Sequence, residues 1–278
     1  MIRDTFFDWH RFVNVCRKEM VEGWKANLLR MVLMYGVLAI ALVWNAYVEY
    51  DGDRSREAIE GNVWSFGVVA FIWGITVMGC LSASFTMERM KTKTSRMAML
   101  MTPATMFEKF FARWVVFTFV FLVVYIIAYK LADWTRILVF MAKYPEMDHI
   151  GQVPLCSHMV SECRTCTEHW TAFPDYWRFM LGVSGYFFFQ SCFVLGSSIW
   201  PKNAFLKTFA AGVIIVIVYA LIGTMLAKLL ISDYYVDREH PSEEALWACM
   251  TVVAFAMALF NWILAYFRFK ESEIINRW

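Results

Sequence analysis

The 278-residue chain is 60% hydrophobic and only 18% charged, whereas a soluble domain usually has about 45–50% apolar and about 25% charged residues. This composition excludes a disordered chain and a disulfide scaffold, and it argues against an ordinary soluble enzyme. The net charge of +2 and the absence of a Lys/Arg-rich block argue against a nucleic-acid partner. The chain is therefore predicted to be a membrane protein.

Residues 1–30 are predicted to form an amphipathic helix at the membrane surface. They carry charges throughout and lack an apolar h-region, so we do not expect a cleavable signal peptide. Apolar side chains three or four positions apart form one stripe of this helix: Phe6, Trp9, Val13, Cys16, Met20 and Trp24. Such a helix lies along the inner interface or packs its stripe on the protein's own cytoplasmic side, and the two interpretations are compatible.

Six stretches without Asp, Glu, Lys or Arg predict an all-α, polytopic membrane fold. A bilayer core of about 30 Å needs roughly 20 apolar residues in a helix, because lipid offers the backbone no hydrogen-bond partner. The third stretch, 114–129, is short, and we extend it back to residue 110. The predicted spans are residues 31–48, 63–83, 110–129, 179–200, 208–227 and 245–267.

The charges of the flanking segments predict the orientation of these spans. Residues 1–30, 84–113, 201–207 and 268–278 are each net positive and together carry +9. The alternate segments are each net negative and together carry −7: residues 49–62, 130–178 and 228–244. Because Lys and Arg concentrate on the cytoplasmic side, both termini and the tail 268–278 are predicted to be cytoplasmic.

The loop 84–109 contains the sequence signals of a helix break and a new helix start. The residue before a proline avoids the helical region, so a break is expected at Thr102, before Pro103. Thr105 and Glu108 then have the spacing of a capping box, so the third span should begin inside the cytoplasm. The methionines ahead of this break, beside basic residues, suit a protein partner. The alternative is a solvated basic loop that only determines topology.

The predicted outer loop 130–178 contains three clustered cysteines, Cys156, Cys163 and Cys166. An oxidising exterior favours a disulfide between two of them, with a connectivity that the sequence does not reveal. Free thiols remain an alternative, as does a zinc site in which His169 completes the spacing. Residues 134–141, which are mostly apolar but include Arg136, are too short to span, so we expect a helix along the membrane surface there.

The sequence contains no motif for catalysis in this chain. It lacks the P-loop G-x-x-x-x-G-K-[ST], a zinc-hydrolase H-E-x-x-H and a G-x-S-x-G nucleophile elbow. We therefore expect neither an enzyme nor a cofactor. Within the spans, Gln190 and Asn261 are the strongest candidates for hydrogen bonds across helices or for a pathway lining, and packing is the simpler role.

Several short motifs resemble one family of transporters. A surface helix precedes six spans, and the motifs are Ser-Ala-Ser-Phe at 82–85, Thr-Pro-Ala-Thr at 102–105, Phe-Glu-Lys-Phe-Phe-Ala-Arg-Trp at 107–114, Asn-Trp at 261–262 and Tyr-Phe-Arg-Phe-Lys at 266–270. This arrangement resembles the permease subunits of type-2 ABC exporters, particularly compact versions from Bacteroides-like bacteria. Thr102 departs from the family pattern, which has leucine there.

The resemblance implies an inner-membrane permease that pairs as a homodimer and docks a separate ATPase. Residues 86–101 would form the coupling helix that receives the motion of the ATPase, and the N-terminal helix would be an elbow. The candidate coupling residues are Glu88, Arg89, Lys91, Lys93 and Arg96. The alternative function is a non-transporting membrane scaffold or sensor that uses the outer loop 130–178 to bind a ligand or partner.

Overall fold

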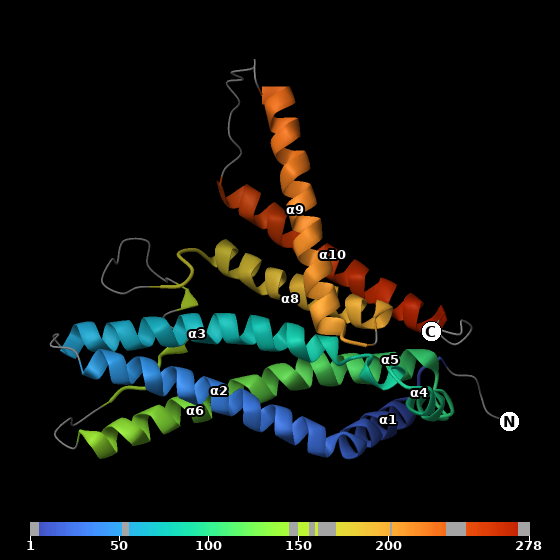
Figure 1. The fold of residues 1–278 in the computed structure, drawn as a ribbon, viewed down its shortest axis with the longest axis horizontal. Helices are drawn as coiled ribbons and strands as arrows, with labels where there is room; N and C mark the ends of the chain where they lie inside the picture. The colour runs from blue at the N-terminus through green and yellow to red at the C-terminus, as the bar shows by residue number, and fades with distance from the viewer. Residues whose placement is uncertain are drawn as a thin grey trace. The chain divides into compact units, whose positions relative to one another are not determined.

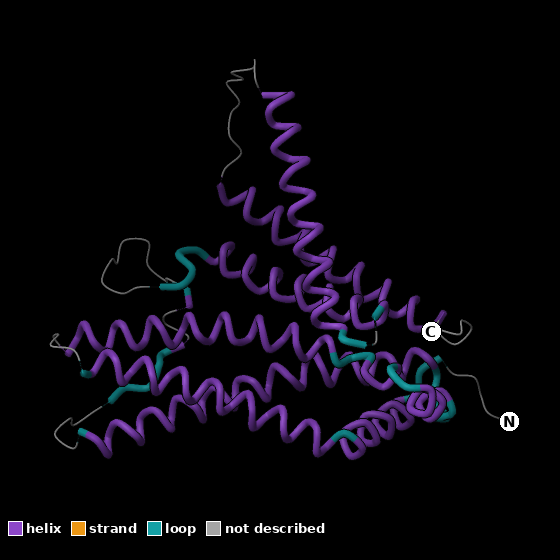
Figure 2. The backbone as a smooth tube through the Cα atoms, viewed as in Figure 1, coloured by secondary structure: helices purple, strands orange, loops and turns teal. Residues whose placement is uncertain are grey.

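The computed structural model describes residues 6–51, 56–144, 150–155, 159–160, 171–200, 202–231 and 243–271. This part of the chain is helical apart from connections and a single isolated bridge between Val160 and Phe173 (Figures 1 and 2). The elements are α1 (Trp9–Glu22), α2 (Trp24–Tyr50), α3 (Arg56–Ser84), η1 (Glu88–Met90), α4 (Lys93–Leu100), α5 (Met106–Val115), η2 (Val116–Val120), α6 (Phe121–Lys143), α8 (Tyr176–Ile199), α9 (Ala204–Ile231) and α10 (Glu243–Glu271).

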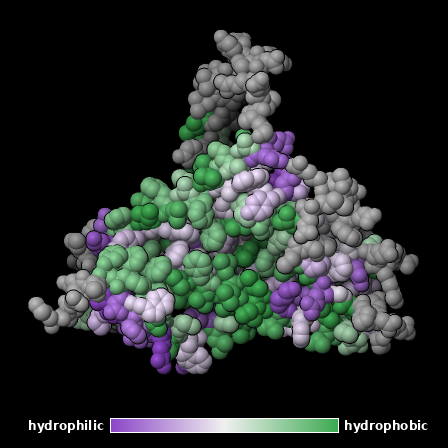
Figure 3. Space-filling model, turned by 180° about the vertical axis from the view of Figure 1, so that it is seen from behind, coloured by the Kyte–Doolittle hydropathy of each residue, from purple (hydrophilic) through white to green (hydrophobic). Residues whose placement is uncertain are grey.

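Within these residues, six helical segments are long and apolar enough to cross a membrane, which confirms the predicted all-α, polytopic fold class. The helices that contain these segments are longer than the charge-free stretches; α2, for example, has 27 residues and so measures about 40 Å. Hydrophobic side chains cover much of the described surface drawn in Figure 3. Large exposed apolar side chains such as Ile40, Trp44 and Trp73 are therefore available to lipid.

The third span extends further than the sequence suggested. Residues 134–141, expected as a separate surface helix, belong to α6, which continues without interruption to Lys143. Of the three charges at the start of this extension, on Lys130, Asp133 and Arg136, the last two pair with each other on one helix face, at 2.8 Å, so they do not end the helix. The first fourteen residues of the predicted outer loop are thus helical.

The chain divides into two compact units, one comprising Met1–Ser82 with Pro103–Val183, and the other Ala83–Thr102 with Ser184–Trp278. The core of the first unit lies where α2, α3 and α6 run side by side (Figure 1). There Leu38 and Leu42 of α2 pack against Tyr125 and Tyr129 of α6. This burial fixes α6 along its neighbours.

Two tyrosines of α6 also hydrogen-bond to the backbone of α3. The Tyr125 hydroxyl donates to the Phe71 carbonyl at 3.0 Å, and the Tyr129 hydroxyl donates to the Gly67 carbonyl at 2.8 Å. A Cβ atom at Gly67 would lie 3.1 Å from the Tyr129 oxygen, and one at Gly74 would collide with the Tyr125 oxygen. The two glycines therefore permit the close approach of the helices.

We expect Gly74→Ala to destabilise the first unit by about 1–3 kcal/mol, because the added methyl group displaces Tyr125 from its hydrogen bond. Gly36→Ala on α2 is the matched control, since a Cβ atom there meets nothing within 4 Å and alanine favours the helix. Thermal unfolding of the detergent-solubilised protein measures both variants. Equal midpoints would show that Gly74 is not a contact position.

Candidate functional site

The connection between α3 and α5 contains the short helices η1 and α4 (Figure 2), and its side chains bond to nearby backbone groups. The Thr92 side chain caps α4 by accepting from the Ser95 N–H at 3.3 Å. The Ser95 hydroxyl donates to the Arg89 carbonyl at 2.6 Å, and Arg96 Nη2 donates to the Met90 carbonyl at 3.1 Å. These bonds fix the orientation of α4 relative to η1.

Helix α4 has one buried and one exposed side. Met99 is buried, as is Met90 of the preceding turn. Lys93, Met97 and Met101 lie four residues apart and are exposed, Met97 to 60% and Met101 to 84%. We call these three side chains the α4 surface; its methionines combine apolar character with a flexible, adaptable shape.

The five charged residues predicted for this loop have different surroundings. Lys93 lies on the α4 surface. Lys91 Nζ pairs with Glu88 Oε1 at 3.0 Å, and Arg96 reaches back to the loop backbone. Arg89 is half-buried. Sequence reasoning noted the methionines but did not separate the exposed Met97 and Met101 from the buried ones, because that distinction depends on packing.

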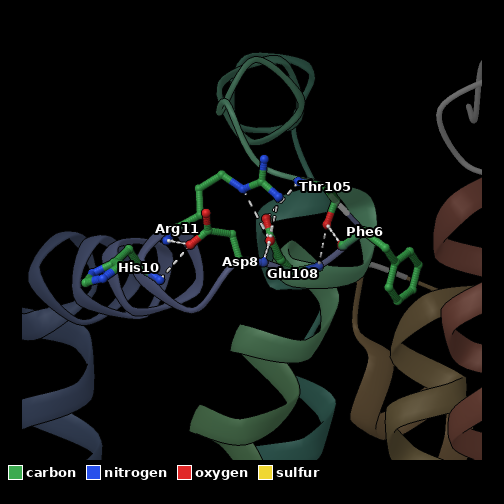
Figure 4. A network of polar contacts seen from close by, with 6 residues as sticks. All are labelled: Phe6, Asp8, His10, Arg11, Thr105 and Glu108. Atoms are coloured by element: carbon green, nitrogen blue, oxygen red, sulfur yellow. Dashed lines mark hydrogen bonds and ion pairs between the residues drawn. The ribbon is translucent and has the colours of Figure 1, made fainter. Parts of the chain in front are cut away.

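The capping box predicted at the start of α5 is confirmed, and the carboxylate in it has additional partners. The Glu108 N–H donates to Thr105 Oγ1 at 3.2 Å, and the Thr105 N–H donates to Glu108 Oε2 at 3.0 Å. Glu108 Oε1 accepts from the Asp8 N–H at 2.8 Å and from Arg11 Nη2 at 2.9 Å. We call these four residues the α1–α5 clamp; Figure 4 shows the Arg11 side chain and the Asp8 backbone meeting the Glu108 carboxylate beside Thr105.

The clamp joins the starts of two helices. Asp8 is the N-cap of α1, and its side chain accepts from the His10 N–H at 2.9 Å. The Thr105 hydroxyl also donates to the Phe6 carbonyl at 3.1 Å. Glu108 is fully buried, so its charge depends on these donors. A buried carboxylate with several donors is stable only while all of them are in place.

Helix α1 presents two faces about a quarter-turn apart. Phe12 and Val15 are buried against Ala112 and Phe111 of α5. The predicted apolar stripe lies on the other face, where Trp9 is 65% exposed. The stripe members Val13 and Met20 of α1 are exposed as well, as are Phe6, which precedes α1, and Trp24, which begins α2. Helix α1 therefore packs on α5 through Phe12 and Val15, which the predicted stripe did not include.

Cys16 lies at the edge between these two faces and is half-buried. Burial, together with the nearby Glu19 carboxylate, raises the pKa of the Cys16 thiol. The same Glu19 lies 4.0 Å from Arg113 Nε on α5. The charged groups of α1 thus add a second tie to α5.

A second buried polar group lies on the α6 extension. Asp133 and Arg136 are both essentially inaccessible to solvent. Asp133 Oδ2 accepts from the Val153 N–H at 3.0 Å, and Arg136 Nη2 donates to the Gly151 carbonyl at 2.8 Å. The pair therefore fixes residues 150–155, which we call the strap, against α6.

The predicted cysteine cluster, Cys156, Cys163 and Cys166, lies outside the described residues, and so does His169. The four described cysteines are free thiols: Cys16, Cys80, Cys192 and Cys249. In the described ranges, no group of His, Cys, Asp and Glu is arranged to hold a metal ion.

Gln190 and Asn261 form hydrogen bonds between α8 and α10 in the second unit. Gln190 Oε1 accepts from Trp262 Nε1 at 3.2 Å, and Asn261 Nδ2 donates to the Ser191 hydroxyl at 3.1 Å. Gln190 and Ser191 are fully buried. In lipid such pairs satisfy polar groups that have no water to bond to.

Compared with known proteins, the chain matches no protein-family model, no curated protein and no solved structure.

Proposed function

We propose that the chain is the membrane-spanning permease subunit of an ABC-type exporter, driven by a separately encoded ATPase. The observation that carries the proposal is the α4 surface, where Lys93, Met97 and Met101 are exposed on a loop whose other side is buried through Met90 and Met99. The resemblance of the short motifs to type-2 exporter permeases identifies the partner, and the homodimer rests on that resemblance.

The chemistry of the α4 surface favours a protein partner. Exposed methionines outside the membrane-spanning helices need a cover that excludes water, and interface cores are enriched in methionine. The charge difference between the two sets of loops, +9 against −7, supports placing this loop and both termini in the cytoplasm of an inner-membrane protein. ATP and its hydrolysing subunit are available on that side.

The α1–α5 clamp supports a mechanical role for the same region. An ATPase that moves the α4 surface would pull on the start of α5, which Glu108 ties to α1 through Arg11 and the Asp8 backbone. The exposed stripe of α1 would rest on lipid while its other face follows α5. Motion of the ATPase would then be passed to the third span.

The proposal predicts that Met97→Asp combined with Met101→Asp reduces recovery of the ATPase at least tenfold. Two carboxylates in an apolar contact are costly to desolvate, and loss of about 1.4 kcal/mol corresponds to a factor of 10. Co-purification from gently solubilised membranes, with mass spectrometry to identify and quantify the ATPase, measures this. Met97→Leu combined with Met101→Leu is the control and should retain the partner, because leucine preserves the apolar contact.

Two results would contradict the proposal. Recovery of no ATPase by the wild-type protein would remove the permease function. Unchanged recovery by the double aspartate variant would show that the partner does not bind the α4 surface. Charge reversal at Arg89, Lys91 and Lys93 should weaken the pair as well.

A second function, a non-transporting scaffold or sensor, is favoured by the buried Asp133–Arg136 pair, which fixes part of the 130–178 segment as an ordered structure. This function would survive the double aspartate variant on α4. It would fail on loss of Cys156, Cys163 or Cys166. The two sets of variants therefore separate the two functions.

A further inference from the structure

The third span is interrupted by a π-helical turn, η2, at Val116–Val120 between α5 and α6. A π-helical turn bonds residue i to residue i+5, so it contains one residue more than an α-helical turn. Such turns are rare and occur mostly as single bulges within α-helices, frequently at functional sites. This turn has no proline within it, so its cause must lie in contacts.

A serine from another helix bonds to this turn. The Ser82 hydroxyl on α3 donates to the Phe117 carbonyl at 3.0 Å. The hydroxyls of Ser65 and Thr76 on the same helix instead donate to carbonyls four residues back in α3, Gly61 and Ile72. A backbone carbonyl in lipid requires a donor from the protein. Ser82 supplies one to the π-helical turn.

The turn separates two parts of the third span that are held by different neighbours. On one side, α5 is tied to α1 by Glu108 and by packing of Ala112 against Phe12. On the other side, α6 is tied to α3 by the hydroxyls of Tyr125 and Tyr129. Bending between the two parts would therefore be concentrated in residues 116–120.

We infer that residues 116–120 are a hinge in the third span and that Ser82 is its positioning residue. Ser82 holds the widened turn open by bonding to Phe117, which lets α5 and α1 tilt together while α6 stays on α3. The Ser-Ala-Ser-Phe motif at 82–85 thereby gains a role, because its first residue, Ser82, bonds to the π-helical turn. That the tilt carries the motion of an ATPase rests on the proposed function; the hinge itself does not.

Single-residue deletions test the hinge without any partner. Deleting Phe119 should convert the π-helical turn into an α-helical turn and keep both parts of the span in register, so the protein should unfold within about 4 °C of wild type. Deleting Ile127 is the matched control, since both side chains are exposed and apolar. It brings Tyr125 and Tyr129 one residue closer and turns the helix by about 100° between them, so it should prevent correct folding. Misfolding of both deletion variants would overturn the hinge.

Substitution of Ser82 tests its positioning role through local exchange. Ser82→Ala should speed amide hydrogen exchange in residues 116–121 about five- to thirtyfold, and Ser82→Thr, which keeps the hydroxyl, should restore the wild-type rate. Ser65→Ala is the control and should leave these amides unchanged, because its hydroxyl serves its own helix. Unchanged exchange in Ser82→Ala would remove the role of Ser82.

Measuring ATP hydrolysis in the complex separates failure of the hinge from failure of the proposed function. With the ATPase bound, deletion of Phe119 should leave complex formation intact and reduce the stimulation of ATP hydrolysis by the permease at least tenfold. Full stimulation would overturn a hinge that transmits motion. If wild type binds no ATPase, the proposed function fails while the deletion and exchange results still decide the hinge.

Discussion

Asp133→Leu is expected to destabilise the first unit by about 3–5 kcal/mol, because it leaves the Arg136 guanidinium buried without its carboxylate. Arg136 is only 1% exposed and Asp133 is not exposed at all, so water cannot replace the lost partner. The substitution also removes the acceptor of the Val153 N–H. The strap should then detach from α6.

Removing both charges should cost much less than removing one. In Asp133→Leu combined with Arg136→Met neither charge of this pair remains buried, and apolar replacements of buried pairs are often neutral or stabilising. The remaining loss, about 1–3 kcal/mol, would come from the Val153 N–H and the Gly151 carbonyl, which both lose a partner. Thermal unfolding in detergent micelles compares the stabilities of the wild type, Asp133→Leu and the double variant.

The half-buried pair of Asp175 and Arg178 is the control for this comparison. It has the same i,i+3 spacing in the same unit, with a 3.5 Å separation and side chains more than a third exposed. Such pairs contribute about 0–1 kcal/mol, so Asp175→Leu should change the unfolding midpoint little. Equal losses for Asp133→Leu and Asp175→Leu would refute the proposed role of burial.

Glu108→Ala is expected to release α1 from α5, at a cost of about 2–4 kcal/mol. The carboxylate caps α5 through the Thr105 N–H, and it also binds the Asp8 N–H and the Arg11 guanidinium. Loss of a cap costs about 1 kcal/mol, and loss of a hydrogen bond to a charged group about 1.5–3 kcal/mol. Amide hydrogen exchange in residues 9–22 should accelerate, while the Tyr125 region should remain protected.

Two further variants test whether the loss in Glu108→Ala comes from the carboxylate of the clamp. Glu108→Gln keeps an oxygen acceptor but loses the charge, so its loss should lie between those of wild type and alanine. Glu22→Ala is the control, because Glu22 pairs with Lys18 at 3.8 Å on the exposed side of α1. If exchange in α1 is the same in Glu108→Ala and Glu22→Ala, the clamp does not hold the helix.

The sequence by itself determined the six spans and the local signals between them. Spans are legible because lipid requires a long uncharged stretch in one continuous piece of chain. The capping box of Thr105 and Glu108 can also be predicted from a short piece of chain, because its two partners lie three residues apart. The stop before Pro103 follows from the steric restriction that proline places on the preceding residue, and α4 ends at Leu100.

Only the tertiary structure decided which side chains these elements bring together. Glu108 and Arg11 are 97 positions apart, and Ser82 and Phe117 are 35 apart, so no local pattern predicts either bond. The charge-free stretch ends at residue 129, before Lys130, but a buried Asp133–Arg136 pair bonded to the strap permits the helix to continue. Local chemistry fixes where helices begin and how long they run; the partners of buried polar groups depend on packing between distant segments.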